Sequence, residues 1–323
     1  ACHEAALSDT IEERKKGEGA GKMAERRIGL VAPYDCKVQT LLRKHLHLTA
    51  SVVSRAKMEP DGITLDGVRV FTDAIAKKGQ TLSLLLSDRE NGDLVPSKGT
   101  VNIVYEDEDL LVADKPAGLP VYPAHGQGTD TLGNYLAEYY RERGIPFVFR
   151  AVNRLDRGTS GLMVVAKHAH CHEVLKHQLH TGDFRRIYLA VVDGAPPETS
   201  GIIDAPIGRA EGTILGRVVT PNGDRAVTHY EVVSRGSRRS LVRLELETGR
   251  THQIRVHMAY VGCPVTGDFL YGTEHPLLPG RTALHSAELF LTGPITGETL
   301  HVTAPIPAVF SALLENDSKD DAI

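Results

Sequence analysis

The stretch Ala151-Val152-Asn153-Arg154-Leu155-Asp156-Arg157-Gly158-Thr159-Ser160-Gly161-Leu162-Met163-Val164-Val165 places one carboxylate between two arginines, in a polar turn flanked by apolar runs. Nearby positive charge favours the ionised form of a carboxylic acid, so we expect Asp156 to be charged at neutral pH. Asp156 is therefore a candidate nucleophile. The alternative is a purely structural turn, in which the aspartate side chain bonds its own backbone.

A second polar cluster lies downstream and consists of Thr248-Gly249-Arg250-Thr251-His252-Gln253-Ile254-Arg255-Val256-His257-Met258. Like the first, it is crowded with basic and hydrogen-bonding groups. Two such clusters suggest one shared site. Thr251 is a candidate N-cap and Gly262 a candidate C-terminal stop, so we expect a short helix over Gln253 to Val261.

Together the two clusters resemble the motifs of RluA-type pseudouridine synthases, H-R-L-D-x-x-T-S-G and G-R-x-H-Q-I/L-R-x-H. Further matches follow in the same order: Tyr105-Glu106-Asp107, Ala113-Asp114-Lys115-Pro116-Ala117-Gly118-Leu119, Arg186-Ile187-Tyr188-Leu189-Ala190 and Gly267-Asp268-x-x-Tyr271-Gly272. The resemblance covers roughly Val101 to Pro307. One position departs from the pattern, because Asn153 stands where the family usually has histidine, and this puts an orienting role for that residue in question.

The resemblance implies isomerisation of specific uridines in ribosomal or transfer RNA. The bond between uracil and C1′ breaks, the base turns in the pocket and C5 rejoins C1′, without a cofactor. The implied catalytic residues are Asp156, Tyr188 and Arg255. Attack on C1′, removal of a ribose proton and addition to C6 all stay open for Asp156.

The resemblance also implies roles around the flipped base. Arg154 would fill the gap that the base leaves, Tyr188 would stack on the uracil and remove the C5 proton, Ile254 would form an apolar platform, and Arg255 would pair with Asp156. The alternatives are a surface arginine at 154 and a core tyrosine at 188.

Basic groups of the second cluster are further candidates for RNA binding. Arg250, His252 and His257 would contact phosphate, with solvated surface as the alternative for each. Among the histidines at 168, 170, 172, 177 and 180, no carboxylate or cysteine completes a tight ligand set, so we expect no metal.

The composition of the chain limits the kinds of protein that it can be. The 323 residues contain no apolar run near the roughly 20 residues that span a bilayer, and the four cysteines show no metal-type or disulfide spacing. We expect no membrane, a cytoplasmic location and a monomer. The net charge of -4 is unusual for an RNA binder. Basic residues nevertheless gather near the start of the chain and around Asp156, where the set is Arg150, Arg154, Arg157, Lys167, Lys176, Arg185 and Arg186.

Patterns along the chain predict five segments. Residues 1–26 are a disordered extension, in which the glycines of 17–22 only superficially resemble a phosphate loop. Residues 27–88 form a small RNA-binding domain that weakly resembles the one named after ribosomal small-subunit protein four, with a generic packing module as the alternative. Its signals are a helix cap at Thr49 or Ser51 and an Asp66-Gly67 hairpin. Residues 89–100 form a linker, 101–312 the catalytic domain and 313–323 an acidic tail.

The catalytic segment mixes strand and helix patterns. Strands are expected at Val101 to Val104, Leu110 to Ala113, Leu162 to Ala166, Tyr188 to Val192 and Leu241 to Leu246. Helical spacing precedes Gly144 and Gly182. The predicted fold class is α+β, with a mainly antiparallel mixed sheet and flanking helices, as in the pseudouridine synthase fold.

Two other functions stay open. A non-catalytic RNA-binding or ribosome-assembly factor with a vestigial pocket is compatible with Asn153. An N-glycoside hydrolase shares the chemistry at C1′, but it would need a second group to activate water.

Overall fold

The computed structural model describes residues 25–88, 90–123 and 128–320. Most of the predicted N-terminal extension, including the glycines of 17–22, and the last residues of the predicted acidic tail lie outside these ranges. Within the described chain, every helix is too short or too polar to cross a membrane.

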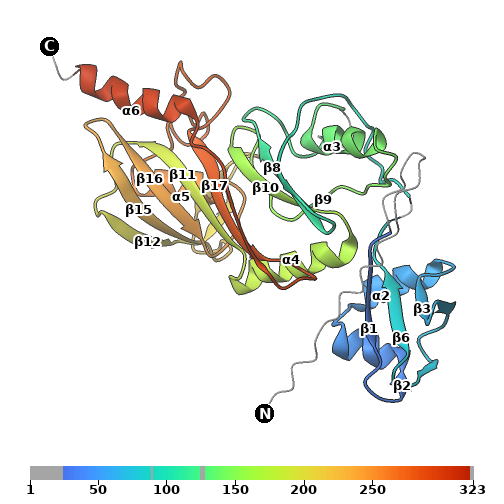
Figure 1. Cartoon of the computed structure of the whole chain (residues 1–323). Helices are drawn as coiled ribbons and strands as arrows, with labels where there is room; N and C mark the ends of the chain where they lie inside the picture. The colour runs from blue at the N-terminus through green and yellow to red at the C-terminus, as the bar shows by residue number, and fades with distance from the viewer. Residues whose placement is uncertain (1–24, 89, 124–127, 321–323) are drawn as a thin grey trace.

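The N-terminal part forms a small unit beside the main sheet (Figure 1) and folds around its own hydrophobic core. Strands pair in the order β1-β6-β3-β4, and β2 pairs with β5. Thr49 accepts a hydrogen bond from the Val52 N–H and so caps α2, as predicted. Asp66 and Gly67 have φ of 48° and 80°, as a tight hairpin requires. The elements are β1 (Arg27–Val31), β2 (Cys36–Lys37), α1 (Val38–Thr40), the π-helical turn η1 (Leu41–His45), α2 (Ala50–Met58), β3 (Ile63–Leu65), β4 (Val68–Arg69), β5 (Ile75–Ala76) and β6 (Thr81–Leu85).

The rest of the chain is built on a ten-stranded sheet with the order β12-β15-β16-β11-β17-β10-β8-β7, in which β18 also pairs with β17 and β9 with β10. Its strands are β7 (Asn102–Glu106), β8 (Leu110–Lys115), β9 (Arg150–Ala151), β10 (Ser160–Ala166), β11 (Arg185–Asp193), β12 (Ser200–Asp204), β15 (Val227–Arg235), β16 (Arg239–Leu246), β17 (Leu284–Thr292) and β18 (Thr299–Thr303). A small hairpin joins β13 (Ile207–Arg209) to β14 (Arg217–Val219).

Helices cover both faces of this sheet. They are α3 (Leu132–Arg141), α4 (Ala169–Thr181), α5 (Gln253–Tyr260) and α6 (Ala308–Asp320). Leu162 and Val164 of β10 pack in the cluster that contains Cys171 of α4, whereas Met163 packs in the cluster that contains Leu136 of α3. Successive strand residues point to opposite faces, so β10 is buried throughout. The predicted fold class, α+β with a mainly antiparallel sheet, is confirmed.

The two halves of the sheet meet at β10 and β17, which form the one parallel pairing among the described strands. The register joins Ser160 to His285 and Gly161 to Ser286. Gly161 has a φ of 106°, and a Cβ atom there would lie 2.3 Å from the Ser286 carbonyl oxygen. Only glycine permits this approach. The turn that carries Asp156 enters the sheet at this junction.

Both predicted flanks of the catalytic segment pack against it. The described part of the predicted linker bonds to the main body, through Gly92 N–H to the Phe147 carbonyl at 2.9 Å and Asn134 Nδ2 to the Val95 carbonyl at 2.8 Å. At the other end, α6 crosses the predicted start of the acidic tail, and Leu313 is fully buried in the main core. The apolar residues of α6 explain why the helix continues past residue 312.

Candidate active site

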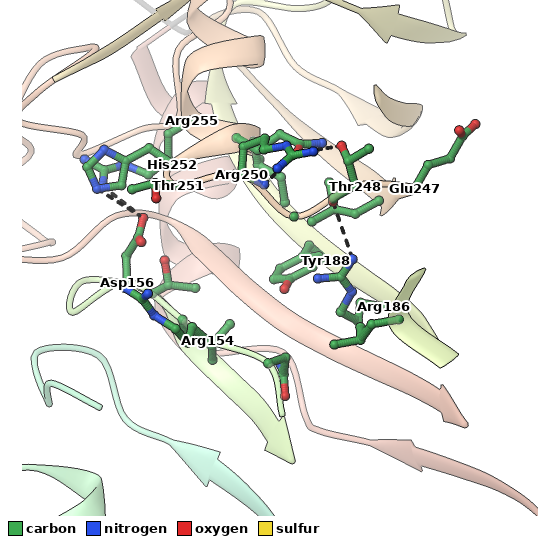
Figure 2. A pocket seen from close by; sticks show the side chains of 18 of the residues that line it. Arg154, Asp156, Arg186, Tyr188, Glu247, Thr248, Arg250, Thr251, His252 and Arg255 are labelled. Atoms are coloured by element: carbon green, nitrogen blue, oxygen red, sulfur yellow. Dashed lines mark hydrogen bonds and ion pairs between the residues drawn. The ribbon is translucent and has the colours of Figure 1, made fainter. Parts of the chain in front are cut away.

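A pocket of about 470 Å³ opens beside the junction of β10 and β17. Its walls come from the turn before β10, from α4, from β11, and from the segment that runs from the end of β16 into α5. All seven site residues predicted from the sequence line it: Asp156, Tyr188, Arg255, Arg154, Ile254, Arg250 and His252. Figure 2 shows Asp156 pointing toward His252 and Arg255 at the start of α5. Segments about a hundred residues apart in sequence thus form one site, since Asp156 and Arg255 are 99 positions apart.

Asp156 contacts Arg255, as the resemblance implied. The Arg255 Nη1 donates to Asp156 Oδ2 at 3.1 Å. The same guanidinium donates through Nε and Nη2 to the two carboxylate oxygens of Asp268, at 2.6 and 2.7 Å. Burial lowers the pKa of Arg255, but the bonds and charges of Asp268 and Asp156 outweigh this effect and raise its pKa. Arg255 therefore stays charged and in place.

The Asp156 segment is also a tight turn. The Thr159 N–H bonds to the Asp156 carbonyl at 3.1 Å, so the turn and the candidate nucleophile coexist. Beneath it, the fully buried Lys115 ammonium donates to the carbonyls of Pro116, Leu119 and Arg157, at 2.9, 3.0 and 3.3 Å. Burial lowers the pKa of Lys115 to about 8, against the opposing charge of Asp156. Lys115 thus holds the backbone of the turn. The Asp156 side chain remains 30% exposed.

The apolar surface of the pocket comes from Tyr188 and Ile254. Each is only 4% exposed, and each belongs to the main hydrophobic cluster while lining the pocket. Tyr188 is therefore both a residue of the hydrophobic core and a residue of the pocket wall. Burial raises the pKa of Tyr188, so its phenol is neutral at pH 7.

His252 lies between Asp156 and the motif around Tyr271. Its Nδ1 is 2.7 Å from Tyr271 Oη, and its Nε2 is 3.8 Å from Asp156 Oδ2. Burial lowers the pKa of His252, against the charge of Asp156, so the imidazole is neutral at pH 7. His252 has a φ of 59° and precedes α5 as its N-cap. The prediction that Thr251 caps this helix was wrong, because the chain turns through the left-handed region one residue later.

His257 does not reach RNA, contrary to our expectation. It is fully buried, with Nδ1 2.9 Å from Thr228 Oγ1 and Nε2 2.9 Å from the Ala205 carbonyl oxygen. Both ring nitrogens are therefore occupied inside the fold. The helix turns His257 away from the face that presents Arg255.

Asn153 holds the turn to the sheet. Its Oδ1 accepts from the Val164 N–H at 2.8 Å, and its Nδ2 donates to the Leu162 carbonyl at 3.4 Å. Both polar atoms thus bond to the β10 backbone and neither bonds to Asp156. The substitution for histidine leaves the pairing of Asp156 with Arg255 intact.

The pocket is positively charged although the whole chain carries a net charge of -4. Two carboxylates line it, Asp156 and Glu247, against six cations, which are Arg154, Lys176, Arg186, Arg225, Arg250 and Arg255. Four members of the predicted basic set do not line the pocket. Arg150, Lys167 and Arg185 pair with acids, as Arg150 does with Asp88 at 2.6 Å, and Arg157 donates to the Gly118 carbonyl. Local charge at the pocket, rather than the sum over the chain, suits an anionic ligand.

The histidines around α4 do not assemble a metal site. Among the described residues, no group of three histidine, cysteine, aspartate or glutamate side chains is placed to hold a metal ion. His168 instead accepts from the Cys171 N–H at the start of α4, and its Nε2 is 3.0 Å from Asp109 Oδ1.

Three residues of this site were not assigned roles from the sequence: Asp268, Tyr271 and Lys115. Each lies in a segment that matched the family, Gly267-Asp268-x-x-Tyr271-Gly272 or Ala113-Asp114-Lys115-Pro116. A signal was therefore present. The sequence does not show which residues Asp268 and Lys115 contact, so it could not assign them a role.

Comparisons with known proteins agree with this geometry. Residues 109–260 match the family model described as RNA pseudouridylate synthase. The RNA pseudouridine synthase YhcT of Bacillus subtilis is 41% identical over 253 residues, which make up 78% of this chain and 83% of that protein. This chain belongs to the RNA pseudouridine synthase family.

Other relatives give the same family. Ribosomal large subunit pseudouridine synthase D of Pseudomonas aeruginosa is 40% identical over 267 residues, which cover 78% of this chain and 82% of that protein. A solved structure of human RNA pseudouridylate synthase domain containing 1 superposes with a TM-score of 0.53 at 28% identity, over 65% of this chain and 86% of that chain. The predicted function, an RNA pseudouridine synthase of the RluA type, and the predicted enzyme class, an isomerase acting on RNA, are confirmed.

Proposed function

We propose that Asp156 is the essential carboxylate of uridine isomerisation in this RNA pseudouridine synthase, and that Arg255 holds it in place. The observation that carries this assignment is the 3.1 Å bond from Arg255 Nη1 to Asp156 Oδ2 inside a pocket large enough for a nucleotide. The carboxylate is partly exposed, while its arginine partner is buried. This arrangement leaves the reactive oxygen free and its orientation fixed.

We assign the remaining roles from position. Tyr188 and Ile254 offer buried apolar surface to the uracil, and Tyr188 stacks on the base. Removal of the C5 proton by Tyr188 stays a prediction. Arg154 is exposed at the pocket and fills the space of the flipped base. Arg250 contacts the RNA from an exposed position, and His252 contacts it beside Asp156.

The substrate class follows from chemistry and from relatives. Ribosomal RNA and transfer RNA are the candidates, and the names of the Pseudomonas aeruginosa and Vibrio cholerae relatives refer to the large ribosomal subunit. We therefore expect ribosomal RNA first. The N-terminal part, with its own core and the basic α2, is proposed to bind RNA as the small domain predicted for 27–88. A monomeric state and a cytoplasmic location stay predictions.

A tritium-release assay tests the proposed activity. Ribosomal and transfer RNA labelled with tritium at uracil C5 are incubated with purified protein, and released label is measured together with the nucleosides of the digested product. We expect release of label and appearance of pseudouridine. Free uracil would indicate a glycoside hydrolase, and no release from any cellular RNA would leave only the non-catalytic function.

A further inference from the structure

Arg186 is a buried cation of the pocket that the roles above do not use. Its residue is 8% exposed, and it lines the pocket beside Tyr188 (Figure 2). Its hydrogen bond to the rest of the described chain is long, from Nη2 to the Thr248 carbonyl at 3.4 Å. Its Nε is buried and has no hydrogen-bond partner among the described residues.

This state is costly for an arginine. A guanidinium carries five N–H donors and a permanent charge, and a buried charge is normally paired with an acid. No carboxylate lies within ion-pair distance of Arg186 in the described part of the chain, whereas the neighbouring Arg185 bonds to Glu245 through Nε at 2.6 Å and Nη2 at 3.1 Å. The two neighbouring arginines of β11 therefore differ. Arg185 is paired with an acid, whereas Arg186, which lines the pocket, has no acidic partner among the described residues.

The absence of a side chain at residue 249 leaves space beside the Arg186 guanidinium. A Cβ atom at Gly249 would lie 3.1 Å from Arg186 Nη1 and 3.7 Å from Nη2. Gly249 thus keeps open the space next to both terminal nitrogens. An arginine fork presented in this way fits the two oxygens of a phosphate.

We propose that Arg186 is the receptor for a backbone phosphate of the RNA, next to the uridine that Tyr188 contacts. The proposal rests on the proposed function for the identity of the polymer. Arg186 and Tyr188 lie on the same face of β11, two residues or roughly 7 Å apart, so one nucleotide reaches from a base on the tyrosine to a phosphate on the arginine. Lys176, which also lines the pocket without an ion pair among the described residues, adds charge on the same side of the site.

An uncharged uracil carbonyl is the competing ligand. It would accept hydrogen bonds from the guanidinium but would leave its charge unpaired. Salt dependence separates the two ligands, because each phosphate contact releases counterions and a carbonyl contact does not.

The test is filter binding of fragmented bacterial ribosomal RNA to the full-length protein over a range of salt concentrations. For Arg186→Met we expect roughly 10-fold weaker binding at low salt, and a slope of log affinity against log salt reduced by about 0.7 to 0.9. Arg186→Lys should recover most of the slope. Arg185→Met is the matched control, because it removes an adjacent arginine that is already paired with an acid, and it should keep the wild-type slope.

Gly249→Ala tests the same site without removing charge. The added methyl group crowds Nη1, so binding should weaken and the salt slope should fall. If Arg186→Met does not fold, the salt slope of Gly249→Ala tests the proposed phosphate contact on its own. A wild-type slope in both variants, or a loss of affinity by one factor at every salt concentration, would overturn the proposal. Because binding is measured without turnover, a protein that isomerises no RNA would fail the assay of function, and its salt slope would still support or contradict the role of Arg186.

Discussion

Arg255 and Asp268 form a two-point ion pair in which the Nε–Oδ2 distance is 2.6 Å and the Nη2–Oδ1 distance is 2.7 Å. Asp268 is fully buried, and its Oδ1 also accepts from the backbone N–H groups of Leu270 and Tyr271. The guanidinium is thereby fixed, with Nη1 left for Asp156. The position of the proposed catalytic carboxylate thus depends on an acid that does not line the pocket.

Asp268→Asn should impair both stability and activity. The amide loses the negative charge and one acceptor oxygen, so Arg255 is left as a buried charge with one partner. We expect a loss of roughly 3 to 5 kcal/mol in the free energy of unfolding, measured with urea. Because the carboxylate shifts, kcat for tritium release should fall about 100-fold.

The matched control for this variant is Asp224→Asn, at an exposed aspartate 3.8 Å from Arg250. Its free energy of unfolding should stay within about 0.5 kcal/mol of wild type. An Asp268→Asn protein with wild-type stability and kcat would show that Asp268 does not position the Asp156 carboxylate.

Asn153→Ala should affect stability more than catalysis. The substitution leaves the buried Val164 N–H without its acceptor, which costs about 1 to 3 kcal/mol. The ion pair between Asp156 and Arg255 remains, so kcat of the folded protein should stay within about 3-fold of wild type. Urea unfolding and tritium release measure the two quantities. Asn102→Ala, at an exposed site on β7, is the control, and a collapse of kcat at full stability would show that Asn153 orients Asp156 after all.

The sequence predicts most of this fold because its signals are local. Alternating or continuous apolar runs located β8, β10, β11 and β16, and helical spacing before Gly144 and Gly182 located α3 and α4. Gly182 indeed ends α4 with a φ of 89°. Such patterns record which side of an element is buried and do not depend on distant partners.

What the sequence could not supply depends on long-range contacts. The parallel pairing of β10 with β17, the bond from Asp268 to Arg255 and the burial of His257 all join segments that only folding brings together. The prediction that Thr251 caps α5 failed for a different reason. His252 takes the left-handed conformation, which few non-glycine residues adopt, and Thr251 offered the usual capping chemistry one position too early.

Acid should destabilise the protein through His285. Burial lowers its pKa to about 4, and the charge of Arg281 acts in the same direction. An unfolded histidine takes up its proton near pH 6.5, whereas the native one does so only near pH 4, so the unfolded state binds more protons between these values. The free energy of unfolding therefore has its full value, as far as His285 is concerned, above about pH 6.5, and it falls as the pH drops towards 4.

His285→Asn should reduce that loss by at most about 3 kcal/mol, since one pKa unit corresponds to about 1.4 kcal/mol. Urea unfolding at pH 7.5, 6 and 5 measures the difference between wild type and variant, which should shift in favour of the variant as the pH falls. His177→Asn, at an exposed position on α4, controls for the loss of a histidine. Parallel pH curves for wild type and His285→Asn would argue against this origin of acid sensitivity.

The most direct test of the central claim is tritium release by Asp156→Asn, measured beside its RNA affinity. The amide keeps the size of the side chain and one acceptor oxygen for Arg255, but it carries no negative charge. If Asp156 is the essential group, release of label should fall at least about a thousandfold, with an affinity for ribosomal RNA within about 3-fold of wild type. Full release of label by Asp156→Asn would contradict the assignment.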